Sequence, residues 1–135
     1  MGLEVSIVTP ESPIATGTYQ EVLAPSALGE VGVLTGHRAL LADLKEGLVV
    51  LQQANGSDTY AVSGGFLEVS DDRVTVLAES AENARDIDVE RATQALADAE
   101  SKLKTLDSAA PDYHAEMARS RRAKVRLQAA KHAAH

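Results

Sequence analysis

The sequence predicts a β + α protein, in which an N-terminal β-sandwich is followed by a C-terminal antiparallel hairpin of two helices. Short aliphatic and β-branched runs are separated by turn signals throughout residues 1–84. After Arg85 the apolar residues recur at alternating steps of three and four, which is typical of an amphipathic helix. A break that contains Pro111 then divides the helical part in two. We therefore expect a sandwich domain at 1–84 and a helical domain at 85–135.

Six runs in the first part are expected as strands, at residues 3–8, 19–23, 46–51, 58–63, 66–69 and 73–78. Pro25 is expected to end the second run, because proline cannot donate to a sheet ladder. The Asn55-Gly56 pair predicts a type I′ hairpin turn, in which both residues have positive φ. Asp71-Asp72 is a further turn signal, and the Gly-rich residues 29–36 predict a strand with tight turns.

The first helix is expected to begin at a cap formed by Asp86 or Asp88. Its apolar seam comprises Val89, Ala92, Leu96, Ala99, Leu103 and Leu106. Pro111 and Asp112 can open a second helix that reaches about Lys131, and so short a link favours an antiparallel hairpin. The larger apolar residues of the second helix do not share one face, so we expect the hairpin to be held weakly and to detach readily.

Composition excludes several classes of protein. Of the 135 residues 44% are hydrophobic and only 3% aromatic, so Val, Leu, Ile and Ala must build the core. There is no Cys, and hence neither a disulfide framework nor thiolate chemistry. No basic segment precedes an apolar run at the N-terminus, and no stretch approaches the roughly 20 apolar residues of a membrane span. We expect no secretory signal and no membrane segment.

The charge is divided between the two parts of the chain. Residues 1–84 carry 12 acids and 3 bases, whereas residues 112–135 carry 2 acids and 6 bases. A nucleic acid would be repelled by the acidic part, and no aromatic residues are interleaved with the bases for stacking. An acidic protein surface is therefore the expected partner of the basic end.

Few residues have the spacing of a catalytic or metal site. His37 is the only His of residues 1–84 and has no Ser, Cys or Asp at a catalytic spacing, so we interpret it as a structural or interface residue. The acidic residues between 79 and 90 (Glu79, Glu82, Asp86, Asp88, Glu90) are interpreted as a solvated linker, and no metal is expected. Arg122 and Arg126 share a helical face, with Arg119 close to it, which suits carboxylates or phosphates but also a solvated cationic face.

Four segments, in this order, resemble the epsilon subunits of bacterial F-type ATP synthases: residues 32–41 (GVLTGHRALL), 64–69 (GGFLEV), 74–82 (VTVLAESAE) and 87–92 (IDVERA). The resemblance implies a non-catalytic subunit of the central stalk, whose sandwich binds the gamma subunit and sits on the c-ring. Such a subunit couples proton-driven rotation of the ring to ATP synthesis. It would lie peripherally on the cytoplasmic face of the bacterial plasma membrane.

The resemblance also implies roles for individual residues. The loop of Gly36, His37 and Arg38 would approach the c-ring, although Thr35 and Ala39 stand where Pro is common in the family. The helices would extend toward the catalytic alpha and beta subunits and inhibit ATP hydrolysis. There the arginines of the second helix (Arg119, Arg121, Arg122, Arg126) would pair with acidic segments of the beta subunits.

Some members of the family bind regulatory ATP on the folded hairpin, and the corresponding residues here are Glu82, Ile87, Asp88, Arg91, Ala92, Arg122 and Arg126. Asp98 stands where other members carry a further Arg, and an acid would repel phosphate. We therefore expect weak ATP binding at most and no required cofactor. The alternatives are a β-sandwich binding module with a regulatory hairpin outside any synthase, and a small hydrolase or isomerase that uses His37.

Overall fold

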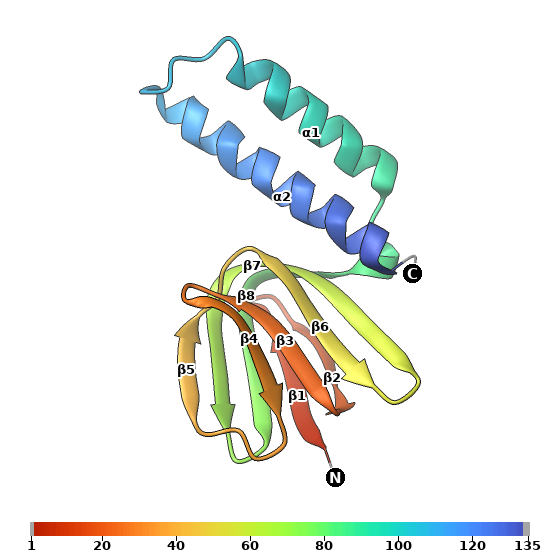
Figure 1. The fold of residues 1–135 in the computed structure, drawn as a ribbon. Helices are drawn as coiled ribbons and strands as arrows, with labels where there is room; N and C mark the ends of the chain where they lie inside the picture. The colour runs from red at the N-terminus through yellow and green to blue at the C-terminus, as the bar shows by residue number, and fades with distance from the viewer. Residues whose placement is uncertain (1, 134–135) are drawn as a thin grey trace.

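Eight strands and two long helices make up the computed structural model, which describes residues 2–133 (Figure 1). Met1, Ala134 and His135, the outermost residues of the two predicted domains, lie outside this range. The strands are β1 (Leu3–Val8), β2 (Pro13–Tyr19), β3 (Glu21–Ser26), β4 (Gly29–Leu34), β5 (Leu40–Asp43), β6 (Gly47–Gln53), β7 (Gly56–Ser70) and β8 (Arg73–Asn83). A single 3₁₀ turn, η1 (Ala84–Asp86), leads into α1 (Val89–Leu103) and α2 (Pro111–Ala133).

The strands form one hydrogen-bonded sheet that folds over itself into two layers. The strand order is β2-β1-β8-β7-β6-β3-β4, and β5 pairs with β7 off this path. The first half of β7 pairs with β6 and its second half with β5, so this strand passes from one layer to the other. The bend falls at Gly64 and Gly65, which both have positive φ, at 52° and 109°. The predicted sandwich followed by a helical hairpin is confirmed.

Alternating side chains fill the space between the layers. Along β1, Leu3, Val5 and Ile7 are buried while Glu4 is exposed, and β8 repeats this pattern with Val74 and Val76. One cluster of aliphatic residues and two tyrosines, all from residues 3–78, forms this core. The sandwich therefore has a core to which the helices contribute no residue.

Part of the sheet is buried on both faces. Residues 59–62 of β7 are all buried, whereas a strand with one face in solvent would alternate between buried and exposed residues. Tyr60 and Val62 belong to the sandwich core, whereas Ala61 belongs to a second apolar cluster with Ala129 of α2. The helical hairpin thus covers the outer face of β6 and β7.

The structure corrects several expectations about the strands. β3 runs through Pro25 to Ser26, because its pairing with β6 covers only residues 21–23 and the missing N–H costs no bond on that side. β2 was not expected from the sequence. The runs at 58–63 and 66–69 belong to one strand, β7.

The two predicted turns have different outcomes. Gln53 pairs with Gly56, so the β6–β7 turn is centred on Ala54 and Asn55. Of the expected Asn55-Gly56 pair only Gly56 has positive φ, at 146°, so the type I′ assignment is wrong. Asp71 and Asp72 do form the β7–β8 turn, with φ of 50° and 61°.

The helices begin and end close to the predicted positions. Asp88 is the N-cap of α1, and its carboxylate accepts a hydrogen bond from the backbone N–H of Arg91 at 3.0 Å. Asp107 opens the link to α2 by accepting from the N–H of Ala109 at 2.9 Å. The seam of α1 buries Ala92 and Ala99 completely, while Val89 is half exposed.

Two faces of α2 make contacts, one with α1 and the other with the sandwich. This explains why its large apolar residues do not form a single stripe. Ion pairs from Glu116 and Arg119 to α1 mark one face. Val125 and Ala129 pack on the sandwich and mark the other. The fully buried positions of α2 are small residues, Ser120, Ala123 and Ala129, which allow close approach on both sides.

Candidate regulatory site between the sandwich and the helical hairpin

The hairpin rests on the sandwich through a patch of mostly small side chains. Buried Ala61, Ala84, Ile87 and Ala129 form its centre, and Leu48, Val125 and Ala130 pack against them. Since alanine removes little apolar area from water, this contact contributes modestly to docking at roughly 25 cal/mol per Å². The specificity of the contact must therefore come from its polar groups.

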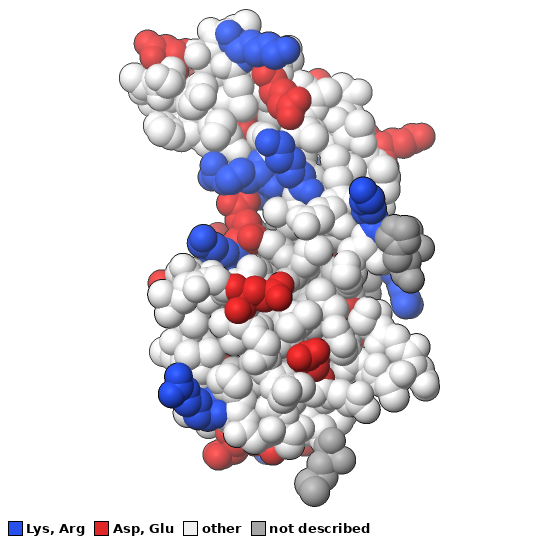
Figure 2. Space-filling model, in the orientation of Figure 1, with Lys and Arg blue, Asp and Glu red and all other residues white. Residues whose placement is uncertain are grey.

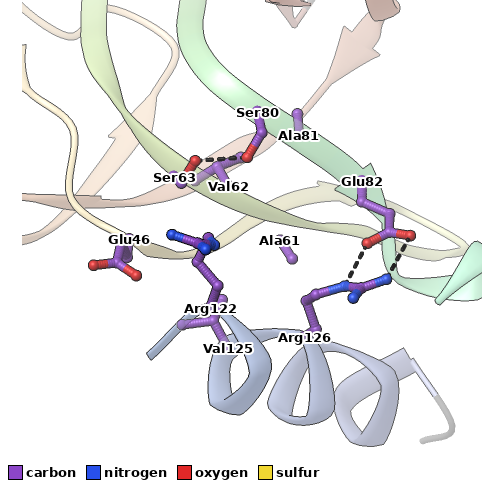
Figure 3. A pocket seen from close by; sticks show the side chains of 10 residues that line it. All are labelled: Glu46, Ala61, Val62, Ser63, Ser80, Ala81, Glu82, Arg122, Val125 and Arg126. Carbon is purple, nitrogen blue, oxygen red and sulfur yellow. Dashed lines mark hydrogen bonds and ion pairs between the residues drawn. The ribbon is translucent and has the colours of Figure 1, made fainter. Parts of the chain in front are cut away.

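Two arginines of α2 pair with carboxylates of the sandwich. Arg126 donates from Nε to Oε1 of Glu82 at 2.8 Å and from Nη2 to Oε2 at 3.2 Å, so the pair is bidentate (Figure 3). Arg121 donates from Nε to Oε1 of Glu46 at 3.0 Å. We call Glu82–Arg126 and Glu46–Arg121 the interface ion pairs. Basic (blue) and acidic (red) surfaces meet in the hollow between hairpin and sandwich (Figure 2).

A small cavity of about 120 Å³ opens beside the interface ion pairs. Its lining residues are Glu46, Ala61, Val62, Ser63, Ser80, Ala81, Glu82, Arg122, Val125 and Arg126. Ser63 and Ser80 form a hydroxyl–hydroxyl hydrogen bond of 2.6 Å on its wall. Arg122 reaches from α2 into this space, and no carboxylate among residues 2–133 lies within ion-pair distance of it.

The structure brings together only some of the residues that were expected to bind ATP. Glu82, Arg122 and Arg126 line the cavity. Ile87 is buried in the apolar patch, and Ala92 is fully buried in α1. Neither these two residues nor Asp88 and Arg91 line the cavity.

Asp88 and Arg91 have a local role that is visible in the fold. The Asp88 carboxylate caps α1 by accepting from the backbone of Arg91, and the two side chains form no ion pair. Glu79 and Glu82 belong to β8, so the interpretation of the acidic residues as a solvated linker is wrong for these two.

The remaining arginine predicted to contact beta subunits, Arg119, faces α1. Its guanidinium lies 3.8 Å from Asp98 and 3.5 Å from Glu116, and Glu116 also lies 3.6 Å from Lys102. This network crosses from α1 to α2 and was not foreseen from the sequence, because it depends on how two helices align.

The predicted loop at Gly36, His37 and Arg38 lies at the end of the sandwich opposite the hairpin (Figure 1). The N–H of Gly36 donates to Asp72 Oδ1 at 2.7 Å, which ties this loop to the β7–β8 turn. The N–H of His37 donates to the Leu34 carbonyl at 3.1 Å, and its Nδ1 lies 2.7 Å from the Arg38 carbonyl oxygen. Asp72 is the residue that sequence reasoning missed here, since nothing in the sequence relates positions 36 and 72.

Titratable groups with shifted pKa values lie in the sandwich core, away from the interface. Burial raises the pKa of Tyr19 to about 12, and the hydrogen bond from its hydroxyl to Asp58, at 2.9 Å, adds to this. Burial likewise raises the pKa of Tyr60. Within residues 2–133 no group of three or more His, Cys, Asp or Glu residues has the geometry to hold a metal ion.

Family models match both parts of the chain. Residues 2–84 match the model described as ATP synthase, delta/epsilon chain, beta-sandwich domain. Residues 85–131 match that described as ATP synthase, delta/epsilon chain, long alpha-helix domain.

Curated relatives are similar over almost the whole length. An ATP synthase epsilon chain of Anaeromyxobacter sp. (strain Fw109-5) is 40% identical over 130 residues, which cover 96% of this chain and 98% of the relative. An ATP synthase epsilon chain of Anoxybacillus flavithermus is 48% identical over 101 residues, which cover 75% of each.

Solved structures share the fold at lower identity. A chain in the structure of the mitochondrial ATP synthase of Euglena gracilis, comprising OSCP, F1 and c-ring, superposes with a TM-score of 0.71 at 24% identity. That match covers 99% of this chain and 82% of the other. A chain of the central stalk and c-ring of Tetrahymena thermophila mitochondrial ATP synthase gives 0.66 at 18% identity, covering 96% of this chain and 97% of the other.

Proposed function

This chain belongs to the epsilon-chain family of ATP synthase, and on that premise we propose that it is a central-stalk subunit that couples rotation of the c-ring to ATP synthesis. We propose further that its helical hairpin inhibits ATP hydrolysis. The chain itself would catalyse no reaction, and its partners would be the gamma subunit, the c-ring and the alpha and beta subunits.

An exposed apolar row on the sandwich supports attachment to a partner chain. Phe66 on β7 is 50% exposed and Leu77, directly opposite on β8, is 44% exposed. Val8 of β1 lies opposite Leu77 on the other side. Contiguous apolar side chains on an outer sheet face mark interaction sites, and a gamma subunit is the occupant that the family premise favours.

The loop at Gly36, His37 and Arg38 is placed to make a second contact, with the c-ring. It lies at the end of the molecule opposite the hairpin, so a partner there would not obstruct movement of the helices. The hydrogen bond from Gly36 to Asp72 gives the loop a fixed support in place of the proline that is common in the family. His37 would act as a contact residue here and not as a base.

One observation carries the inhibitory role: α2 presents its arginines toward carboxylates. Arg121 and Arg126 pair with Glu46 and Glu82 of the sandwich in the folded hairpin. Guanidinium groups that recognise carboxylates within the chain can recognise them on another protein, and the acidic segments of the beta subunits supply such groups. Bound there, the helices would block rotation.

No helix within residues 2–133 is long and apolar enough to cross a membrane. We propose that the chain reaches the membrane through the complex, as a peripheral subunit on the cytoplasmic face of a bacterial plasma membrane.

ATP hydrolysis by a matched head of alpha, beta and gamma subunits tests the proposal. The full chain is compared with a version that ends at Asp86, which retains every residue of the sandwich core. We expect both to bind gamma and only the full chain to slow hydrolysis. If neither binds gamma, the stalk role is wrong and a binding module outside the synthase is favoured. If both bind and neither inhibits, the inhibitory role alone is wrong.

A further inference from the structure

The interface ion pairs join the hairpin to the sandwich across long stretches of chain. Arg126 and Glu82 are 44 residues apart, and Arg121 and Glu46 are 75 apart. The apolar contact beneath them consists chiefly of alanines, which slide over one another with little loss of packing. Directional hydrogen bonds between charged groups therefore fix where α2 sits on the sheet.

The charges beside these pairs disfavour a nucleotide, although size alone does not exclude one, because hollows of about 410 Å³ lie next to Glu46 and are lined also by Arg121 or Arg122. The cavity lined by both Arg122 and Arg126 is smaller, at about 120 Å³. Of the two arginines that line it, Arg126 is already bound at both Nε and Nη2 by Glu82. The carboxylates of Glu46 and Glu82 lie in the same wall and would repel phosphate oxygens.

The other residues of the expected ATP site have different partners. Asp88 caps α1, and Ile87 and Ala92 are buried in apolar contacts. Asp98, at the position where other family members carry an Arg, pairs with Arg119 at 3.8 Å. In the folded hairpin, Arg126 and Asp98 thus already have partners within the chain, whereas Arg122 lies in the cavity without an ion pair to any described residue.

The carboxylate of Glu46 at the interface can accept a further hydrogen bond from an arginine. Oε2 of Glu46 is buried and has no hydrogen-bond partner among the described residues. Arg122 lines the same cavity and has no ion pair there. A small shift of α2 would let Glu46 accept from Arg122 as well as from Arg121, so the interface can tighten without any ligand.

Solvent also reaches the interface ion pairs. The side chains of Arg126 and Glu82 are 29% and 36% exposed, and that of Arg121 is 53% exposed. Pairs with this exposure are screened by salt and can be exchanged for other carboxylates.

We propose that the interface ion pairs, and not a bound nucleotide, hold the hairpin folded in this protein, and that an acidic protein surface releases it by competing for the same arginines. The release step rests on the function proposed above, whereas the holding step concerns the chain alone. Regulation then follows ionic strength and the nearness of acidic partners, and is insensitive to ATP.

The full-length chain is suited to a distance measurement because it contains no Cys. Two engineered cysteines at exposed positions, Asn55→Cys on the sandwich and Ser108→Cys at the hairpin tip, carry a donor and an acceptor dye. Energy transfer between them reports docking of the hairpin. We expect NaCl, raised from about 0.05 M to about 1 M, to lower the docked fraction, because screening weakens ion pairs.

If apolar contacts alone held the hairpin, salt would raise the docked fraction, because a well-excluded salt such as sulfate strengthens the burial of apolar surface. A docked fraction that rises or stays constant with both salts would overturn the proposal. So would an increase in docking with low-millimolar ATP.

Variants separate the ion pairs from general charge effects. Glu82→Gln should lower the ratio of docked to detached hairpin by about fivefold. The double variant Glu82→Arg/Arg126→Glu, which restores the ion pair with its charges exchanged, should have a ratio close to that of the unchanged chain. Glu68→Gln, on the exposed face of β7, is the matched control and should change nothing. Equal effects of Glu82→Gln and Glu68→Gln would contradict a specific role for the pair.

A glutamate-rich peptide tests release, with a glutamine-rich peptide of the same length as control. We expect only the acidic peptide to lower the docked fraction. If salt detaches the hairpin but the peptide does not, release by acidic surfaces is wrong. Inhibition of the catalytic head is measured separately, so that outcome is distinct from a failure of the proposed function.

Discussion

Arg126, in the last part of α2, holds both carboxylate oxygens of Glu82, near the end of β8, at 2.8 and 3.2 Å. The pair closes a loop of chain that contains η1, α1 and most of α2. Its geometry requires the planar fork of a guanidinium, which a lysine cannot reproduce. Several properties of the hairpin can be predicted from this and neighbouring contacts.

Arg126→Lys should keep the charge but lose the bidentate contact with Glu82. We expect the free energy of detachment of the hairpin to fall by about 0.5–1 kcal/mol, because the pair is partly solvated. Amide hydrogen exchange in the C-terminal half of α2 should quicken accordingly. Arg119→Lys, which alters the contacts with Asp98 of α1 and Glu116 of α2 but none with the sandwich, should leave exchange in this half unchanged.

Ala129→Leu should push α2 away from the sandwich. Ala129 is fully buried against Ala61, Ala84 and Ile87, so a larger side chain overpacks the contact by about 1–3 kcal/mol. The dye-labelled chain should show a lower docked fraction. The same exchange at Ala115, which is exposed on α2, serves as the control, and an equal effect there would contradict overpacking.

Gly65→Ala should destabilise the sandwich strongly. A Cβ at this position would overlap the carbonyl oxygen of Leu77, and φ is 109°. Gly29 has a similar φ of 115° but open space around it, so Gly29→Ala carries only the conformational cost of about 1–2 kcal/mol. Urea unfolding should show a loss of at least about 3 kcal/mol for Gly65→Ala. Equal losses would mean that the clash is relieved by the backbone.

Asp88→Ala should weaken the start of α1 by about 1 kcal/mol, whereas Asp88→Asn should be nearly neutral, because asparagine caps as well as aspartate. Hydrogen exchange of the first-turn amides, including that of Arg91, measures this. A loss in Asp88→Asn equal to that in Asp88→Ala would show that the negative charge, and not the capping oxygen, matters.

Stability should fall at high pH because of Tyr19. Its pKa is raised from 10.0 to about 12 in the folded protein, by burial first and by the hydrogen bond to Asp58 second. The folded chain keeps a proton that the unfolded chain loses, so stability that is complete below pH 10 is lost as the pH rises toward 12. The slope is about 1.4 kcal/mol per pH unit for one proton.

Tyr19→Phe should reduce this slope, as measured by urea unfolding between pH 9 and 11 or so. Tyr113→Phe, a change in α2 outside the sandwich core, is the control. An unchanged slope in Tyr19→Phe would assign the effect to Tyr60, whose pKa is also raised by burial.

Local patterns predicted the elements that local physics controls. The alternation in residues 3–8 and 73–78 survives in β1 and β8, and the Asp88 cap and the break before Pro111 bound the helices. The Pro25 expectation failed because a proline is excluded from a strand only where a neighbour needs its N–H, and β6 has separated from β3 by that point.

The candidate site was predicted only in part. Arg122 and Arg126 share a face because four residues make about one helical turn, and this follows from the sequence. Glu46, Ser63 and Asp72 could not be found, since each acts through a residue far along the chain.

The sequence by itself determined the sandwich, the two helices, the division of charge between the acidic sandwich and the basic second helix, and the family resemblance. These features follow from hydrophobic periodicity, turn residues and composition, which act over short distances along the chain. The tertiary structure decided which carboxylates receive the arginines of α2, and that α2 divides its small residues between α1 and the sheet. These contacts depend on the docking of one folded unit on another, where distance in space is unrelated to distance along the chain.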